Sequence, residues 1–386
     1  MQQAAPVASP SWKTRLVGMS WAHLLNDGAS NYLPGVLPAV LATLGEPVKM
    51  AGVLVTALTI GQALQPLTGR LADWLGGRSL VIIGLLMTSV GGGLLGVVPS
   101  TPLLIVLLVL IGVGNSFFHP QAVAAARSMF AGRAGLFTSI FLVGGELGRG
   151  LWPTAASLIV AGLGLPGLWL VAVPGLITAP FLLRLVPALP RKRSTGGGDR
   201  AIRLRVHARP MALLVGYQSI RMFCVYAFVT FIPLLWDQRG AALVTGASVI
   251  TTMMTVGVIG NLTGGQLTDR IGTRRVMIGS AVASAVLIVP AAALTGPAAW
   301  IVAALLGIAL FLTASTTVLL GQDIFPENPS MGSGIALGLS NGIGALGVFI
   351  IGLWAAGGLL SIFWALAVIS LLSAVLVLGF EKSLMR

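Results

Sequence analysis

The sequence predicts an all-α membrane protein built from two pseudo-symmetric bundles of six transmembrane helices. Three observations predict this class. Of the 386 residues, 56% are hydrophobic and only 9% are charged, whereas an ordinary soluble domain carries roughly 25% charged residues. Apolar stretches of about 20 residues, the length that crosses a bilayer as a helix, recur along the whole chain. A loop motif of the first half is repeated in the second half, which indicates a duplicated bundle.

The apolar stretches divide into six and six around a hydrophilic segment, 188–210. This segment combines a glycine triplet with basic runs and therefore predicts a flexible cytoplasmic linker. We expect one bundle over residues 1–187 and the other over residues 211–386. The twelve expected spans are 16–43, 50–69, 79–98, 101–126, 134–160, 165–187, 211–236, 246–267, 276–295, 298–321, 331–355 and 358–380.

The positive charges set the expected topology. The net charge is +13, but the basic residues alternate from loop to loop. Lys49 and Arg239 lie in loops on one side, Arg149 and Arg221 lie inside spans, and all other basic residues fall on the side of the two termini. Because cytoplasmic loops carry the excess of Lys and Arg, we expect both termini in the cytoplasm and the protein in the inner membrane. The charge reports topology, so no nucleic-acid partner is expected.

Few residues could support a cofactor or a metal centre. Cys224 is the only cysteine, so no thiolate metal cluster can form. The stretch 342-GIGALG-347 matches a dinucleotide motif but lies inside an apolar helix without a preceding strand. We therefore expect no cofactor, no metal and no enzymatic activity. The expected partners of this chain, a monomer, are the lipid bilayer, a small-molecule substrate and protons.

The repeated loop follows the second span of each half. Its copies read 69-GRLADWLGGRS-79 and 265-GQLTDRIGTRR-275. The glycines allow close helix packing, the aspartate can accept from helix N-terminal amides or an arginine, and the arginines anchor the loop in the cytoplasm. We expect the loop to latch neighbouring spans and so to gate the protein. The latch residues are Asp73, Arg78, Asp269, Arg270 and Arg274.

This loop resembles the signature of the major facilitator superfamily, whose two halves enclose a cavity that opens alternately to each side of the membrane. In that pattern an arginine commonly follows the aspartate; Arg270 matches it and Trp74 does not. Three further stretches resemble the fosmidomycin-resistance type of efflux protein, which implies a proton-coupled exporter of small, often anionic or amphiphilic compounds. These are 23-HLLND-27, 112-GVGNSFFHPQAVAAARSMFAGRAGLFTSIFLVGG-145 and 318-VLLGQDIFPENPSMGSG-334.

Four charged residues inside the expected spans predict a functional site. They are Asp27, Glu146, Arg149 and Arg221. A charge at the bilayer centre costs about 2.5 to 3.5 kcal/mol on insertion scales, so charges retained there indicate use. Each lies far enough into its span, at about 1.5 Å per residue, to come near the midplane.

Polar side chains interrupt the first span at spacings of three and four residues, so they share one helix face. That face is expected to line a water-filled pathway, or alternatively only to bond neighbouring helices. We expect Asp27 to carry the proton and His23 to relay it, because burial and a nearby cation change the proton affinity of a carboxyl group in opposite directions. Glu146 is the competing carrier, unless Arg149 neutralises it. The stripe comprises His23, Asn26, Asp27, Ser30 and Asn31.

Arg221 is expected to bind the substrate. No acid lies within a helical turn of it, and a guanidinium can hold a phosphonate or carboxylate through two hydrogen bonds. An ion pair with Asp27 or Glu146 is the alternative. The other expected binding residues supply charge, hydrogen bonds or an apolar wall, and they are Arg149, Asn26, Asn31, Tyr217, Gln218, Tyr226, Phe118 and Trp152.

His119 and Pro120 lie in the cytoplasmic half of the fourth span. Proline frees a carbonyl and kinks a helix, and histidine titrates near neutral pH. We expect this pair to gate the pathway or relay a proton, with a structural kink as the alternative.

The sequence thus favours a secondary active transporter that exports a small organic compound, with anions among the candidates, in exchange for protons. One rival is an importer of a nutrient or metal ion on the same fold. The other is a membrane-embedded enzyme, although no nucleophile–base arrangement or set of metal ligands is visible in the sequence.

Overall fold

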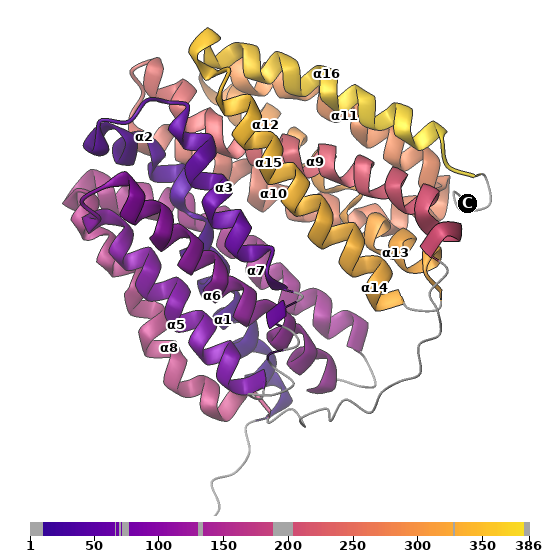
Figure 1. Cartoon of the computed structure of the whole chain (residues 1–386), viewed down its shortest axis with the longest axis horizontal. Helices are drawn as coiled ribbons and strands as arrows, with labels where there is room; N and C mark the ends of the chain where they lie inside the picture. The colour runs from indigo at the N-terminus through magenta and orange to yellow at the C-terminus, as the bar shows by residue number, and fades with distance from the viewer. Residues whose placement is uncertain are drawn as a thin grey trace, which may run out of the picture.

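The computed structural model of the chain describes residues 11–381, apart from 66, 69–70, 72–76, 130–133, 188–203 and 327–328. Every regular element among these residues is a helix. In Figure 1 the helices of the first half, coloured indigo to pink, form one bundle, and those of the second half, coloured red to yellow, form another. The expected all-α fold in two bundles is confirmed.

Nine spans in the described residues are long and apolar enough to cross a membrane, and Met50–Gln62 is a shorter apolar helix. The number twelve stays a prediction. The first half contains α1 (Trp12–Asn31), α2 (Leu33–Leu44), α3 (Met50–Gln62), α5 (Gly77–Leu94), η1 (Leu95–Val97), α6 (Thr101–Met129), α7 (Ala134–Leu163), η3 (Leu165–Val171) and α8 (Ala172–Leu185). The second half contains α9 (Leu204–Gln238), α10 (Leu243–Ile271), α11 (Thr273–Ala293), α12 (Pro297–Phe311), α13 (Ala314–Ile324), α14 (Pro329–Gly334), the π-helical turn η4 (Ile335–Leu339), α15 (Ser340–Gly352), η5 (Ala355–Gly357) and α16 (Leu359–Leu378).

The first expected span, 16–43, is two helices rather than one. α1 and α2 meet at Tyr32, and Pro34 lies at the start of α2. Because Pro34 has no N–H, it cannot extend the hydrogen-bond ladder of α1. The hydroxyl of Tyr32 donates to the carbonyl oxygen of Gly92 on α5 over 2.5 Å, which fixes the break against the rest of the bundle.

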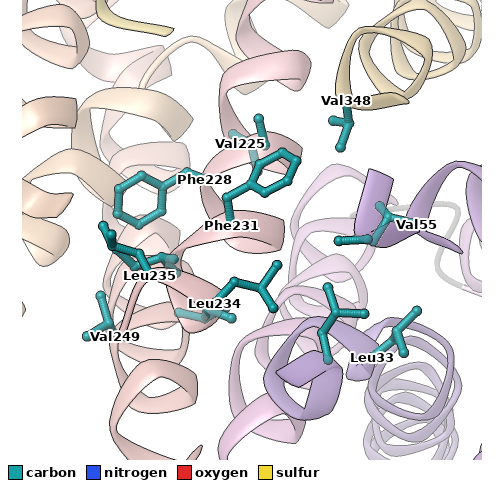
Figure 2. Close-up of a cluster of buried hydrophobic side chains, with 14 of the residues drawn as sticks. Leu33, Val55, Val225, Phe228, Phe231, Leu234, Leu235, Val249 and Val348 are labelled. Carbon is teal, nitrogen blue, oxygen red and sulfur yellow. The ribbon is translucent and has the colours of Figure 1, made fainter. Parts of the chain in front are cut away.

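The two bundles share a hydrophobic core at one end of the molecule. Figure 2 shows this shared core, in which Leu33 and Val55 of the first half approach Phe231, Leu234 and Val348 of the second. The main contacts between the halves are those of α7 with α10, α3 with α15, and α2 with α9 and α10. Along α7 and α10 these contacts run from the bond between Glu146 and Asn261 to the bond between Thr154 and Thr251.

At the end where α1 begins and α16 finishes, each bundle has its own core. The buried cluster around Leu85 and Phe118 contains residues of the first half only. The cluster around Leu214 and Phe325 contains residues of the second half only. Among the described residues, one buried hydrophobic cluster therefore crosses the boundary between the bundles, and the two clusters at the other end do not.

α1 and α7 pack at backbone distance. A Cβ atom on Gly148 would lie 2.2 Å from the carbonyl oxygen of Leu24, and one on Gly28 would lie 2.4 Å from the ring of Trp152. No larger residue fits at these distances, so the glycines are what permits the close approach. The approach brings the charged segment of α7 against the polar stripe of α1.

Candidate functional site

Asp27 lies at the centre of a buried polar cluster in the first bundle. Its side chain is 2% exposed. The Oδ1 atom lies 2.7 Å from Nε2 of His119 and accepts hydrogen bonds from Nδ2 of Asn26 (3.1 Å) and of Asn115 (3.2 Å). One oxygen of the carboxylate is thus satisfied by side chains of α1 and α6.

The other oxygen, Oδ2, has longer contacts. It lies 3.5 Å from Nε2 of His23 and 3.4 Å from Nε of Arg149, and both distances exceed those of strong charge-assisted hydrogen bonds. Gly145 of α7 makes room for this arrangement. A Cβ atom there would lie 2.3 Å from Nε2 of His23 and 2.8 Å from Oδ2 of Asp27.

The ring of His23 is held in one orientation. It stacks on Phe141 with the centroids 4.3 Å apart, and Nδ1 lies 2.8 Å from the carbonyl oxygen of Phe141. A carbonyl oxygen can only accept, so Nδ1 carries a proton and donates it. Nε2 is then directed at Asp27, and it makes no hydrogen bond with the described residues.

The polar stripe of the first span faces other helices of its own bundle. Asn115 donates to the hydroxyl of Ser30 over 3.0 Å, and Gln62 donates to Oδ1 of Asn31 over 3.2 Å. Asn115 and Gln62 were not expected from the sequence. Asn115 and His119 are four residues apart in α6, and this shared face is the signal that could have found Asn115.

Arg149 is the exposed edge of the cluster. Its side chain is 37% exposed, and it makes no hydrogen bond within the described part of the chain. Tyr226, on α9 of the other bundle, lies within electrostatic range of it. Its neighbour Gly150 packs against Thr255 of α10. Arg149 therefore connects the buried Asp27 with the boundary between the bundles.

Glu146 belongs to a different network. Its Oε1 atom accepts from Nδ2 of Asn261 over 2.6 Å, and Oδ1 of Asn261 accepts from the hydroxyl of Ser315 over 2.8 Å. These bonds link α7 with α10 and α13 of the other half. Glu146 and Arg149, three residues apart, form no ion pair among the described residues, because Arg149 turns toward Asp27. The expected neutralisation of Glu146 by a direct ion pair is therefore not observed.

Arg221 is buried at the division between α12 and α13. It is 2% exposed, and its Nη2 donates to the carbonyl oxygen of Ala309 over 2.7 Å and also to that of Leu310. Carbonyls at a helix C-terminus lack intrahelical donors, and a cation is favourable there. No ion pair of Arg221 with Asp27 or Glu146 occurs among the residues described. In this structure Arg221 supports a helix end and is not open to a ligand.

The remaining expected binding residues are mostly packed. Tyr217 is buried and donates to the carbonyl oxygen of Met277 over 3.1 Å, and Gln218 is buried beside it. Phe118 is buried and stacks on the histidine of the first span. Trp152 is half-buried against α1.

The expected gating residues are placed as follows. α6 continues through Pro120 without interruption, and His119 contacts Asp27. Nε of Arg78 donates to the carbonyl oxygen of Val186 over 2.8 Å, which ties α5 to the end of α8. Asp269 and Arg270 are exposed and Arg274 is half-buried, and no ion pair links them within the part of the chain that is described. Asp73 lies outside the described residues.

The cluster also has the composition of a metal site. One ligand atom each from His23, Asp27 and His119 lies within 4.8 Å of the others, and imidazole suits transition metals. Against this, Arg149 lies 3.4 Å from the same carboxylate, and its positive charge opposes a second cation there.

Two helical bundles joined by a core at one end, with nine helical spans among the described residues that are long and apolar enough to cross a membrane, define a polytopic membrane protein. The sequence profile of the Major Facilitator Superfamily matches residues 19–347. The chain belongs to this superfamily.

Relatives and solved structures agree with this assignment. The chain is 28% identical over 371 residues to the fosmidomycin resistance protein of Escherichia coli (strain K12), with 91% of this chain and 90% of the relative covered. It is 27% identical over 355 residues to an MFS-type transporter of Bacillus subtilis, YfnC, with 87% and 85% covered.

Solved structures share the fold at lower identity. The nucleoside transporter NupG gives a TM-score of 0.75 at 16% identity, covering 94% of this chain and 98% of that one. A bacterial homologue of the lysosomal transporter Spinster, inward-facing and unoccupied, gives 0.75 at 15% identity, with 96% of each chain covered.

Proposed function

We propose that the protein is a secondary active transporter that exports a small organic compound in exchange for protons. The observation that carries this proposal is the pairing of Asp27 with His23 in a buried cluster that reaches the boundary between the bundles through Arg149. Ionisable side chains buried in membrane bundles typically mark proton and substrate pathways.

The contact between His23 and Asp27 is a place for a proton. Because Nδ1 of His23 donates to Phe141, Nε2 and Oδ2 both present lone pairs when neither group is protonated. Two facing acceptors repel each other, and a proton on either one converts the contact into a hydrogen bond. His119 at Oδ1 supplies a second titratable neighbour. Glu146, which is bonded to the other bundle, is the alternative carrier.

The arrangement of the cores supports alternating access. The positive-inside rule puts the termini in the cytoplasm, so the end where the bundles have separate cores is the cytoplasmic one. The shared core then closes the outer end. We assign the structure to an inward-facing state, from which rocking of one bundle against the other would expose the site to the outside.

Arg149 replaces Arg221 as the proposed substrate-binding cation. Arg149 is 37% exposed, whereas Arg221 is buried and donates to backbone carbonyls. A guanidinium can hold a carboxylate or phosphonate in a bidentate way. A relative named for fosmidomycin resistance supports the export of a small toxic compound.

Arg149 also determines whether a bound anion moves in the same direction as the proton or in the opposite direction. Protonation of Asp27 removes the charge that attracts Nε of Arg149, so an anion on Arg149 and a proton on Asp27 favour each other, and this linkage is reciprocal. An anion bound in this way travels with the proton. The pairing of Asp27 with Arg149 therefore supports a second candidate function, proton-coupled uptake of an anion. Exchange requires a neutral or cationic compound whose binding competes with the proton at Asp27.

Transport by purified protein in liposomes separates the two candidates. An inwardly directed proton gradient is imposed, and the movement of a radiolabelled compound is followed. The first compounds are a phosphonate and a neutral analogue. Exchange predicts that the compound moves against the proton flux, and uptake predicts movement with it. Movement at the same rate with and without the gradient would refute proton coupling altogether. Vesicles that contain the Asp27→Asn variant are the control for leakage through the membrane.

A further inference from the structure

A groove lies on the surface of the first bundle, between α1 and α8, away from the Asp27 cluster. Its volume is about 670 Å³. It lies at the end of the molecule where α1 begins and α8 finishes. The groove is lined by Lys13, Thr14, Val17, Gly18, Phe181, Arg184 and Leu185.

The groove has a defined floor. Gly18 has no side chain to fill it, and a Cβ atom there would lie 2.5 Å from Cδ1 of Leu185. One turn further along, the indole Nε1 of Trp21 donates to the hydroxyl of Thr178 over 3.2 Å. This bond holds α1 and α8 at a fixed spacing, so the groove is a built feature of the helix pair.

The groove is basic at one end and apolar along the rest of its length. Lys13 is in the first turn of α1 and Arg184 in the last turn of α8, so both cations are at the same membrane surface. Deeper in the bilayer the walls are apolar, with Val17 69% and Phe181 58% exposed. None of the lining residues is acidic, and no ion pair involves Lys13 or Arg184 among the residues described.

Lys13 lies 5.6 Å from the centroid of the Trp12 ring, and neither Lys13 nor Arg184 has an acidic partner among the described residues. Two such cations above an exposed apolar channel complement an anionic head group attached to an acyl chain. We infer that this groove binds an anionic phospholipid, with the phosphate between Lys13 and Arg184 and an acyl chain along Val17 and Phe181. Basic pockets between membrane helices at the cytoplasmic side are suited to such head groups. The inference does not depend on the proposed direction or coupling of transport.

Native mass spectrometry of the full-length protein in a neutral detergent tests this site. The probes are phosphatidylglycerol and phosphatidylcholine with identical acyl chains, and soluble glycerol phosphate. We expect the protein to retain phosphatidylglycerol selectively. Removing both cations by K13Q/R184Q is expected to weaken that retention roughly 30-fold. Each basic residue near an anionic membrane surface contributes about 1 kcal/mol, which is roughly 5-fold in affinity, and the two contributions multiply.

A matched control and a second variant keep the test decisive. K49Q/R239Q removes two basic residues from the opposite end of the molecule and is expected to leave retention unchanged. Val17→Trp fills the channel while it keeps both cations, and is expected to reduce lipid retention. Equal retention of the two lipids, an equal loss in K49Q/R239Q, or no loss in Val17→Trp would overturn the assignment. Equally strong binding of glycerol phosphate would show a phosphate site without a lipid channel and would also overturn it.

Discussion

Thr56 and Ala345 belong to different bundles and are joined by a hydrogen bond, in which the Thr56 hydroxyl donates to the Ala345 carbonyl oxygen over 3.0 Å. Nearby, a Cβ atom on Gly52 would lie 2.8 Å from the carbonyl oxygen of Val348. α3 and α15 therefore meet at backbone distance beside the shared core. This contact is one that an outward-facing state would have to break.

Replacing Thr56 with Val should shift the protein toward the outward-facing state. The change removes a bond of about 0.5 to 1.5 kcal/mol, which corresponds to roughly a 2- to 12-fold change in the ratio of the two states. The alkylation rate of a cysteine introduced as Val55→Cys, in a Cys224→Ser background, reports the opening. Thr263→Val, which alters an exposed threonine bonded within its own helix, should have no effect. Slower alkylation in Thr56→Val would contradict the proposal.

Replacing Asp27 with Asn should abolish proton-driven transport while it preserves exchange of substrate for substrate. The amide keeps the shape of the side chain but cannot take up a proton. The measurement is uptake into liposomes with and without a pH gradient. Asp237→Asn, which alters an exposed acid at the end of α9, is the control and should leave coupling unchanged. If Asp27→Asn remains coupled and Glu146→Gln does not, Glu146 is the carrier.

Replacing Gly145 with Ala should block transport more strongly than the addition of a single methyl group suggests. The new methyl group would lie 2.3 Å from Nε2 of His23, so it must push the histidine from Asp27 or part α1 from α7. Overpacking of this kind typically costs about 1 to 3 kcal/mol. Melting temperature and proton-coupled transport are measured together. Gly162→Ala is the control, because no atom lies within 4 Å of a Cβ there. Normal coupling in Gly145→Ala would argue against the His23 contact.

Replacing Arg221 with Ala should destabilise the protein rather than change its substrate preference. The change removes the side-chain donor of the Leu310 carbonyl and leaves the Ala309 carbonyl with the Ser280 hydroxyl alone. A hydrogen bond to a charged group contributes about 1.5 to 3 kcal/mol. Thermal unfolding in detergent measures the loss, with the exposed Arg239→Ala as the control. Unchanged stability combined with selective loss of anion transport would restore Arg221 to the substrate site.

Replacing Arg149 with Gln should remove the pH dependence of anion binding. Under the proposal, uptake of a proton by Asp27 at lower pH should free Arg149 and strengthen anion binding, and loss of that proton at higher pH should weaken it. Without the guanidinium, anion binding should be weak and flat with pH, while binding of a neutral analogue should change little. Titration calorimetry over a pH series measures both. An anion affinity that still rises on acidification would locate the binding cation elsewhere.

The sequence predicted the class of fold because composition and hydrophobic length depend on local residue content alone. It also predicted that Asp27, His23 and Asn26 share a face, since helical spacing fixes that relation. It did not predict which cation meets Asp27. Arg149 and Arg221 lie at similar depths, and depth says nothing about rotation around the bundle, which tertiary packing decides.

Of two further features, the sequence contains a signal for the first only. Pro34 follows directly on the polar stripe, and its missing N–H gives a reason to end α1 near Tyr32. Gly145 stands beside the charged segment of α7, but only the approach of α1 shows why no side chain fits there. Relations of this second kind, between residues distant in sequence, cannot be derived from one chain without coordinates.

The shared core has a thermal consequence. Each turnover of an alternating cycle must expose part of the shared core to water and then bury it again. The residues concerned are Leu33, Val55, Phe231 and Val348. Exposure of apolar surface carries a large positive heat capacity. The temperature dependence of transport should therefore give a curved Eyring plot, and trimming these side chains should straighten it.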